Sequence, residues 1–325
     1  MNIAIVGCGL IGEKRAKALD ERHKIIITAD LDIKRAEKVA QINGNNGIAV
    51  KDWKDAVSHP EVDIVIVATT NNLLTPISIT ALENNKHVLL EKPGARDSKE
   101  IEELVNISQK KHRIVKLGFN HRFHPSFLKL NELIDNNDVG ELMFIRGRYG
   151  HGGRVGYDKE WRANPEISGG GELLDQGVHL IDLSRMLLGD FLHIDGFTNT
   201  YFWDMKVDDN AFLSLRTEKD QMAWLHVSCS EWKNMFCFEV YYKKAKFQID
   251  GLGGSYGTER LTYYKMLPEM GPPETMMWEF PGADKSWGKE FDSFVDSIEK
   301  DSPVWGGIND AYEALKIVDK ISGKV

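Results

Sequence analysis

The sequence predicts an α/β doubly wound parallel sheet of the Rossmann type, followed by an α+β domain with an open, mostly antiparallel sheet. Apolar strands alternate with helical segments over the first 120 residues, the pattern of a parallel sheet with crossover helices. A glycine motif joins the first strand to the first helix. Residues 192–267 hold strand-like aromatic segments whose connections are too short for crossover helices. We therefore expect a nucleotide-binding domain over 1–121 and a second domain over 122–325.

The elements of the first domain follow from its apolar runs and from helix signals between them. The predicted strands cover residues 3–6, 24–29, 62–67, 87–90 and 114–119, with a short strand near Ile48. The predicted helices cover residues 13–19, 33–41, 76–84 and 98–111. Pro76 suits the first turn of its helix, where its missing N–H costs nothing. The carboxyl ends of the strands form the edge at which such sheets bind ligands.

The second domain is expected to begin with a helix over 125–136 and a strand over 142–149. A strong helix over 172–188 follows a glycine-rich stretch. Beyond the antiparallel strands, residues 255–282 are rich in Gly and Pro, so we expect a long loop or a contact between subunits. Helical patterns return at 287–300 and 308–321.

The glycine motif predicts a dinucleotide site. Gly7 allows a tight turn after the first strand, Gly9 lets the backbone approach a pyrophosphate, and Gly12 lets the helix pack closely on the strand. The N-terminus of that helix offers N–H groups and a partial positive charge to the phosphates. Glycines also mark ordinary turns, so the argument rests on the strand and helix that flank them.

An acidic residue completes this site and bears on which nicotinamide cofactor binds. Asp30 ends the second strand, where a carboxylate accepts hydrogen bonds from the adenosine ribose. Asp30 and the nearby Asp32 would repel the 2′-phosphate of NADP, which favours NAD. Lys34 and Arg35 argue for NADP, because either side chain could reach a phosphate from the following helix. NAD is the expected cofactor, with NADP as the alternative.

Lys92 lies just after the predicted strand 87–90, at the ligand-binding edge of the sheet. An ammonium group there could hydrogen-bond a substrate hydroxyl and stabilise alkoxide charge as a hydride leaves. The alternative is a surface lysine beside a turn proline, Pro93. Residue chemistry alone does not separate these two interpretations.

Asp175 and His179 lie four residues apart on the predicted helix 172–188, which places both side chains on one face. A histidine that titrates near neutral pH suits a general base acting on an alcohol. The alternative is an Asp–His pair that stabilises the helix. Gly177, between them, costs roughly 1 kcal/mol relative to a helix former, which predicts a close approach by backbone or ligand.

Two other kinds of site are rejected. His121 and His124 are three residues apart, but no cysteine or carboxylate cluster joins them, so no metal site is expected. Tyr242 and Lys246 have the spacing of a short-chain dehydrogenase pair. They fall in a strand pattern that leads into a turn, which does not place them on one helical face.

Aromatic and basic residues of the second domain suggest a sugar-like substrate. Trp161 lies on no predicted element, and its neighbour Arg162 could bind a carboxylate or a phosphate. Several further arginines could serve a nucleotide-linked sugar, with solvated charges as the favoured alternative; they are Arg122, Arg146, Arg148 and Arg154.

Composition describes an ordinary globular protein of 325 residues with a net charge of −8 and a pI of about 5.7. No net field attracts nucleic acid or anionic lipid, and no apolar run approaches the ~18 residues that span a bilayer. The first strand begins at Asn2, so removal of a secretory signal would destroy the cofactor turn. Three cysteines without metal-ligand spacing are expected to stay reduced. We expect a cytoplasmic protein.

These motifs together resemble the Gfo/Idh/MocA family of nicotinamide-dependent oxidoreductases. The specific signals are Glu91-Lys92-Pro93 followed much later by Asp175-x-Gly177-x-His179; Gly7-x-Gly9-x-x-Gly12, Asp30 and Ala68-Thr69-Thr70-Asn71 fall in the family's order. The resemblance implies a catalytic set of Lys92, Asp175 and His179. It implies cofactor contacts from Gly7, Gly9, Leu10, Ile11, Gly12, Asp30, Thr69, Thr70, Asn71, Glu91 and Lys92. It implies substrate contacts from Lys92, Asn120, Arg122, Trp161, Arg162, Asp175 and His179.

The resemblance also implies a reaction and an oligomeric state, and the chain departs from the family pattern at two positions. The expected activity is oxidation of a secondary alcohol on a sugar, an inositol or a nucleotide-sugar, with hydride transfer to the nicotinamide. The alternatives are a keto-sugar or carbonyl reductase and a cofactor-binding sensor without turnover. The sheet of the second domain would pair subunits in a homodimer or homotetramer. Thr70 and Leu74 stand where the family often has proline and histidine, so contacts to the nicotinamide end could differ.

Overall fold

The structure is a computed structural model that describes residues 1–324, and the chain forms two compact units. The first unit contains residues 1–120, 166–169 and 287–313. The second contains residues 121–165, 170–286 and 314 onward. Two later segments therefore return to the unit that the N-terminal residues build.

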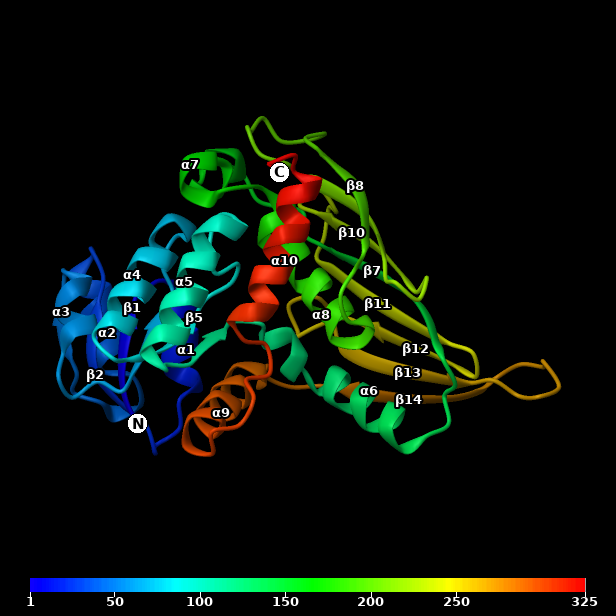
Figure 1. Cartoon of the computed structure of the whole chain (residues 1–325), viewed down its shortest axis with the longest axis horizontal. Helices are drawn as coiled ribbons and strands as arrows, with labels where there is room; N and C mark the ends of the chain where they lie inside the picture. Colours follow the sequence, from blue (N-terminus) through cyan, green and yellow to red (C-terminus); the bar gives the residue numbers. More distant parts are fainter. Residues whose placement is uncertain (325) are drawn as a thin grey trace. The chain divides into compact units, whose positions relative to one another are not determined.

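A six-stranded sheet forms the centre of the first unit (Figure 1). Its strands are β1 (Asn2–Val6), β2 (Lys24–Ala29), β3 (Ile48–Val50), β4 (Ile64–Val67), β5 (His87–Leu90) and β6 (Val115–Leu117). All are parallel and lie in the order β3-β2-β1-β4-β5-β6, which confirms the predicted doubly wound sheet. The order reverses beside β1, and ligands bind such sheets at this switch point.

Helices cover the sheet because its strands are apolar on both faces. They are α1 (Leu10–Ala18), α2 (Ile33–Ala40), α3 (Trp53–Ser58), α4 (Asn71–Glu83), α5 (Ser98–Lys111) and α9 (Ser286–Glu299). The α9 residues Phe291 and Phe294 share a fully packed core with Ile3, Ile5 and Ile64 of the sheet. Burial of this apolar surface fastens a C-terminal helix to the N-terminal fold.

Three helix predictions in this unit need correction. The helix predicted from Pro76 begins five residues earlier at Asn71, so Pro76 lies inside it rather than in its first turn. Burial of Leu74 and Ile77 against the unit outweighs the backbone bond that the proline cannot make. The first helix begins at Leu10 instead of residue 13, and α3 was not predicted because it spans only six residues.

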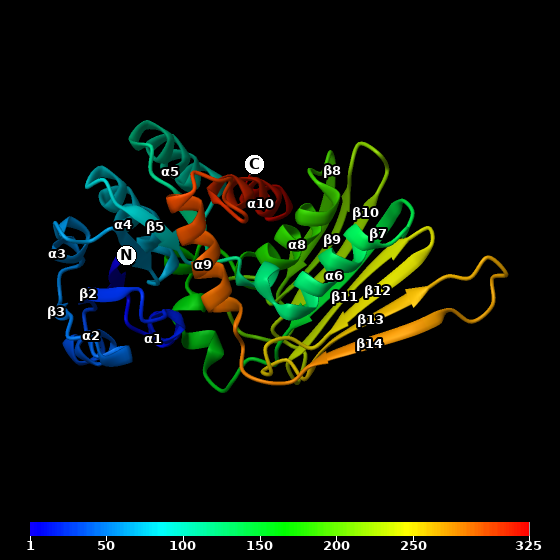
Figure 2. The same cartoon turned by 90° about the horizontal axis from the view of Figure 1, so that it is seen from below.

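The second unit is built on an eight-stranded sheet in the order β14-β13-β12-β11-β7-β10-β9-β8. Its strands are β7 (Leu142–Gly150), β8 (His193–Asn199), β9 (Asn210–Arg216), β10 (Met222–Ser228), β11 (Met235–Tyr242), β12 (Ala245–Asp250), β13 (Glu259–Lys265) and β14 (Glu274–Phe280). Only the β7–β10 pair is parallel, so the sheet is mostly antiparallel as predicted. Figure 2 shows α6 (Pro125–Asn136) and α8 (Val178–Leu188) along one face of this sheet.

Two predictions for this unit are wrong in part. The loop expected over residues 255–282 contains β13 and β14, which form an antiparallel hairpin. β14 is an edge strand whose residues are all exposed or half-buried, so it lacks the alternation that marks a strand. The predicted helix 172–188 begins with a π-helical turn, Leu173–Gly177, before α8 continues.

Further expectations agree with the structure. Tyr242 ends β11 while Lys246 lies on β12, so they do not share a helical face. Cys8, Cys229 and Cys237 are free and buried. Within residues 1–324, none of the helices combines the length and the apolar character needed to cross a bilayer.

Candidate active site

The glycine turn between β1 and α1 uses its three glycines differently. Gly7 has a φ of 90°, and a Cβ there would lie 2.4 Å from the carbonyl oxygen of Ala68. A Cβ at Gly12 would lie 2.0 Å from the carbonyl oxygen of Gly7. These two glycines are required by the protein's own backbone. At Gly9 a Cβ would meet nothing within 4 Å, so this glycine leaves an open space instead.

That open space lies at the start of α1. Gly9 is the N-cap of the helix and supplies no side-chain capping bond, and the next residue, Leu10, is 74% exposed. Uncapped N–H groups and the positive end of a helix dipole favour an anion. The bare Cα of Gly9 leaves room for that anion to approach the backbone. This arrangement fits the pyrophosphate of a dinucleotide.

Asp30 closes the same turn from the end of β2. Its Oδ2 accepts the N–H of Cys8 at 2.8 Å, and its Oδ1 accepts the N–H of Asp32 at 2.9 Å. Each carboxylate oxygen accepts more than one bond, so ribose hydroxyls can still donate to Asp30. Asp32 caps α2 through the N–H of Lys34 and lies 3.5 Å from Nε of Arg35. Arg35 is therefore drawn toward a carboxylate of its own helix.

The segment after β4 contributes short polar side chains. Thr70 is the N-cap of α4, and its hydroxyl donates to Oδ1 of Asn72 at 2.8 Å. Asn71 is buried, and its Nδ2 donates to the carbonyl of Ser168 at 2.8 Å. The hydroxyl of Thr69 donates to the carbonyl of Thr70 at 3.3 Å. Asn71 thus ties the segment 166–169 to the first unit.

A buried ion cluster supports the Glu-Lys-Pro segment. Arg15 donates to Glu91 at 2.6 Å through Nε and to Glu290 at 2.5 Å through Nη1, and its side chain is almost fully buried. Burial disfavours the charged guanidinium, yet the two carboxylates outweigh this and raise the pKa of Arg15. Glu91 was expected to contact the cofactor, and the structure places its carboxylate on Arg15. Lys92 follows directly at the end of β5, half-buried, and the Lys92–Pro93 peptide bond is cis.

The second unit carries Asp175 in the π-helical turn and His179 in α8. Their expected i,i+4 relationship on a regular helix is therefore not what the backbone provides, since a π-turn is wider than an α-turn. A Cβ at Gly177 would lie 2.9 Å from Leu173 and 3.5 Å from Val227, so its close neighbours are side chains. Short π-helical segments occur frequently at functional sites.

His179 is buried, and its ring stacks on that of His121 with centroids 3.8 Å apart and planes at 15°. Tyr149 lies 5.3 Å from His121 and 6.2 Å from His179, centroid to centroid. The ring of His179 is therefore held in one orientation by aromatic neighbours. His121 was considered only as a metal ligand in the sequence, where nothing indicated this stacking.

Several predicted substrate residues meet around Asp175. Nε of Arg162 lies 3.4 Å from Oδ2 of Asp175, and the guanidinium of Arg162 lies 4.5 Å from the ring centroid of Trp161. Glu172, which the sequence did not single out, is buried with its carboxylate 3.6 Å from Nε2 of His151. Burial lowers the pKa of His151, but the carboxylates of Glu172 and Asp175 together outweigh this and raise it. This part of the second unit offers carboxylates, a guanidinium and an indole ring.

The other residues predicted to bind substrate form contacts within the protein or lie on another part of the second unit. Arg122 is buried and forms two hydrogen bonds with Asp182, at 2.8 Å and 2.5 Å, so its guanidinium fork is used within the second unit. Asn120 is buried at the start of the short helix Asn120–Phe123. Arg154 pairs with Glu160 at 2.6 Å. Arg146 and Arg148 lie on β7 and line a hollow on its sheet.

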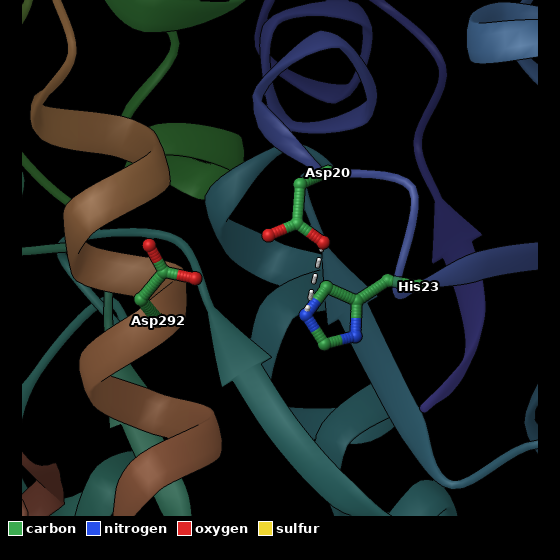
Figure 3. A group of neighbouring side chains, drawn as sticks. All are labelled: Asp20, His23 and Asp292. Atoms are coloured by element: carbon green, nitrogen blue, oxygen red, sulfur yellow. Dashed lines mark ion pairs between the residues drawn. The ribbon is translucent and has the colours of Figure 1, made fainter.

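One group of possible metal ligands occurs among residues 1–324, and it contains none of the predicted site residues. Donor atoms of Asp20, His23 and Asp292 lie within 4.8 Å of one another (Figure 3). Arg22 donates to Asp20 at 2.5 Å and to Asp292 at 2.8 Å, so a cation of the protein already binds both carboxylates. Burial lowers the pKa of His23. The group is an ion-pair cluster, and we assign no metal to it.

Each of the two units contains a segment that matches a known protein family. Residues 1–119 match a family described as "Oxidoreductase family, NAD-binding Rossmann fold", and residues 127–248 match the GFO/IDH/MocA C-terminal domain. The chain is 27% identical to a levoglucosan dehydrogenase of Pseudarthrobacter phenanthrenivorans, over 62% of this chain and 54% of that protein. It is 27% identical to a myo-inositol 2-dehydrogenase of Thermotoga maritima, over 58% and 55%. The alignments thus span little more than half of these relatives.

Solved structures share the fold over nearly the whole chain. A levoglucosan dehydrogenase in complex with NADH and L-sorbose superposes with a TM-score of 0.87 over 99% of this chain and 95% of that one, at 20% identity. A UDP-N-acetylglucosamine 3-dehydrogenase from Acidithiobacillus ferrooxidans superposes with a TM-score of 0.83 over 100% and 97%, at 17% identity. At such identities the likeness establishes the fold alone.

Proposed function

The chain belongs to the Gfo/Idh/MocA family of oxidoreductases, and we propose that it is an NAD-dependent dehydrogenase acting on a secondary alcohol of a sugar, an inositol or a nucleotide-sugar. The uncapped start of α1 carries this proposal, because Gly9 leaves an open space at the positive end of a helix. Asp30 at the end of β2 supports NAD over NADP through its negative charge. The two relatives named above are a levoglucosan dehydrogenase and a myo-inositol 2-dehydrogenase, which supports a polyhydroxylated substrate.

We assign the chemical steps to three residues. NAD, when bound, would accept the hydride from the carbinol carbon. His179 takes the proton of the substrate hydroxyl, while the ammonium of Lys92 donates a hydrogen bond to the same oxygen and stabilises its negative charge. Asp175, next to Arg162, orients the substrate through its hydroxyl groups. The stacked ring of His121 keeps His179 in the orientation that receives the proton.

The test is the absorbance change of the nicotinamide with NAD and a panel of inositols, aldoses, glucuronates and UDP-sugars. We expect turnover with one class, and Lys92→Ala should lower kcat by about 100-fold or more while NADH still binds. Lys99→Ala, an exposed lysine on α5, controls for loss of a positive charge. Full turnover by Lys92→Ala with cofactor bound overturns the assignment.

If no compound of the panel is oxidised although NADH still binds, the reverse reaction, reduction of a carbonyl, is favoured. The same groups would then serve a keto-sugar or carbonyl reductase, with Lys92 polarising the carbonyl and His179 returning the proton. NADH oxidation with keto-sugars measures this directly. Absence of turnover in both directions, with NADH still bound, would leave a cofactor-binding sensor.

We further propose that the protein works in the cytoplasm as a homodimer or homotetramer paired through the open face of the eight-stranded sheet. On the face opposite α6 and α8, Trp224 is 55% exposed beside a hollow of about 450 Å³ lined also by Phe212 and His226. An exposed apolar patch of this kind marks a contact surface. Three buried free thiols support a reducing compartment. Sedimentation velocity of wild type and Trp224→Glu tests the pairing, and an unchanged mass for the variant contradicts it.

A further inference from the structure

Four aromatic rings of the second unit form a continuous row. The ring centroids of Tyr157 and Trp203 lie 5.6 Å apart, those of Trp203 and Phe202 lie 5.1 Å apart, and those of Phe202 and Trp232 lie 5.6 Å apart. Exposure rises along the row, from 4% for Tyr157 to 54% for Phe202 and 87% for Trp232. The row therefore leads from the interior of the unit to its surface.

The inner end of the row lies near the π-helical turn that carries Asp175. The ring of Tyr157 lies 5.5 Å from that of His151, which in turn lies 3.6 Å from the carboxylate of Glu172. Burial, followed by the charges of Asp175 and Glu172, raises the pKa of the Tyr157 hydroxyl. Glu172 is the N-cap of the turn that carries Asp175, so Tyr157 lies close to the proposed substrate residues.

Strand register explains why these rings meet. Ser228 of β10 pairs with both Gly150 of β7 and Asn210 of β9, so the loops that leave these strand ends gather at one edge of the sheet. The loop after β7 carries Tyr157, the loop before β9 carries Phe202 and Trp203, and the loop after β10 carries Trp232.

Specific contacts then fix the rings. The indole N–H of Trp203 donates to the carbonyl of Cys229 at 2.8 Å. Gly153 has a φ of 67°, and a Cβ there would lie 2.4 Å from the ring of Trp203, so only glycine fits beneath this indole. Asp209 accepts the backbone N–H groups of Tyr201, Phe202 and Trp203 at 2.7 to 3.0 Å. These contacts fix the indole of Trp203 and the backbone of the loop that carries Phe202 and Trp203.

The conformation and the exposure of Trp232 both lower the stability of the fold. Its φ of 58° lies in the left-handed region, which a bulky side chain rarely occupies, and its indole faces solvent. Backbone strain and exposed apolar surface both lower stability, and strained residues cluster where a ligand is held. Within the loop Cys229–Asn234, Trp232 is the residue that combines both features.

We infer that Phe202 and Trp232 form an outer subsite that stacks on a second ring of the substrate, so that the preferred substrate is a glycoside. This inference rests on the proposed function, which places the oxidised ring at Asp175 and His179. An aromatic face packs against the apolar face of a sugar ring or an aryl aglycone while the polar edges stay in water, which suits a half-open surface. The continuity of the row with the substrate residues favours this occupant over a second copy of the chain.

The test compares two substrates that share the reacting ring. kcat/KM is measured with NAD for a methyl glycoside and for the phenyl glycoside or disaccharide of the same sugar. Wild type should prefer the two-ring substrate, and Trp232→Gly should lower the ratio of the two kcat/KM values by about tenfold, the scale of removing a tryptophan from a contact. Glycine accepts a φ of 58°, so this variant also keeps the fold. Trp232→Phe should restore most of the preference.

The control is Met270→Gly, which removes another highly exposed apolar side chain at a φ of 58° in a different loop. An unchanged ratio in Trp232→Gly overturns the inference, and a simultaneous loss of oligomer mass would identify the rings as a subunit contact. If no sugar is oxidised, the proposed function fails, and the subsite is tested without turnover. Calorimetry then measures binding of the phenyl glycoside to the NADH complex of the wild type and of Trp232→Gly. Weaker binding by Trp232→Gly supports the subsite, and equal binding overturns it.

Discussion

Asp208 and Asp209 are adjacent in sequence, yet their carboxylates hold two different segments of the second unit. Asp208 accepts the N–H of Gly171 at 3.0 Å and that of Leu173 at 2.8 Å, at the start of the turn that carries Asp175. Asp209 accepts the N–H groups of the aromatic loop before β9. One dipeptide therefore fixes both the proposed catalytic turn and the proposed outer subsite.

Asp208→Asn and Asp209→Asn should separate these two roles. Each change replaces an acceptor oxygen by an N–H donor and leaves a backbone N–H without its partner, which costs about 1–3 kcal/mol of stability. We expect Asp208→Asn to lower kcat about tenfold, because the turn with Asp175 shifts, while Asp209→Asn changes mainly the preference for two-ring substrates. Thermal unfolding and steady-state kinetics on both variants test this. Equal losses of kcat in both variants would contradict the division.

Gly9 and Gly12 are predicted to fail in different ways when a methyl group is added. Gly9→Ala should leave the unfolding temperature nearly unchanged, since its Cβ meets no protein atom within 4 Å and its φ is −75°. It should weaken NADH binding by about tenfold or more by filling the space next to the helix N-terminus. Gly12→Ala should lower stability by several kcal/mol, because its Cβ would lie 2.0 Å from a carbonyl oxygen. Fluorescence titration with NADH and thermal melts of both variants provide the measurements, and a destabilised Gly9→Ala that binds NADH normally would contradict them.

The features predicted most accurately depend on neighbours in sequence. The strand–glycine–helix turn, the parallel sheet and α6 follow from local periodicity and from turn chemistry, and each is confirmed. The motif also distinguishes the glycines by role, and the structure shows why Gly7 and Gly12 tolerate no Cβ. Local rules suffice there because the conformation is set by a few consecutive residues.

The features that sequence did not reveal depend on distant segments or on solvent exposure. In the sequence Arg15 is only one of three basic residues in α1, and nothing there indicates that Glu290 of α9 pairs with it. The stacking of His121 on His179 joins residues 58 positions apart, and no periodicity signals it. β14 is missed because an edge strand exposed on both faces carries no alternation. The π-turn at Asp175 depends on Asp208, whose role appears only when its loop is folded.

Asp30 should determine the choice between NAD and NADP. We propose that the carboxylate of Asp30 accepts the ribose hydroxyls and repels a 2′-phosphate. Asp30→Ala should therefore weaken NADH binding and raise the NADPH to NADH affinity ratio at least about tenfold. Asp52→Ala is the matched control, since it removes the charge and the N-cap of α3 at a cost of about 1 kcal/mol and has no proposed role in cofactor choice. Titration of both variants with both cofactors measures the ratio. Tighter binding of NADPH than NADH by the wild type would overturn the assignment of NAD.

Stability of the first unit should fall in acid because of His87. Its Nδ1 accepts the N–H of Ile114 at 3.1 Å, which requires an unprotonated ring nitrogen. Burial, then the charge of Arg113, lowers the pKa of His87 from 6.5 to about 4. Between pH 6.5 and about 4, His87 is therefore protonated in the unfolded chain but stays neutral in the folded chain. The contribution of neutral His87 to the free energy of unfolding is fully present above pH 6.5 and is lost as the pH falls from 6.5 to about 4.

The full shift corresponds to about 3 kcal/mol, and partial exposure of the ring reduces this to roughly 1–2 kcal/mol. His87→Asn keeps an acceptor for Ile114 but does not titrate, so its unfolding temperature should depend less on pH than that of the wild type between pH 7 and 4.5. His193→Asn, an exposed histidine at the start of β8, controls for the change of residue type. Calorimetric melts across this range decide the matter, because parallel curves for wild type and His87→Asn would show that another group carries the acid sensitivity.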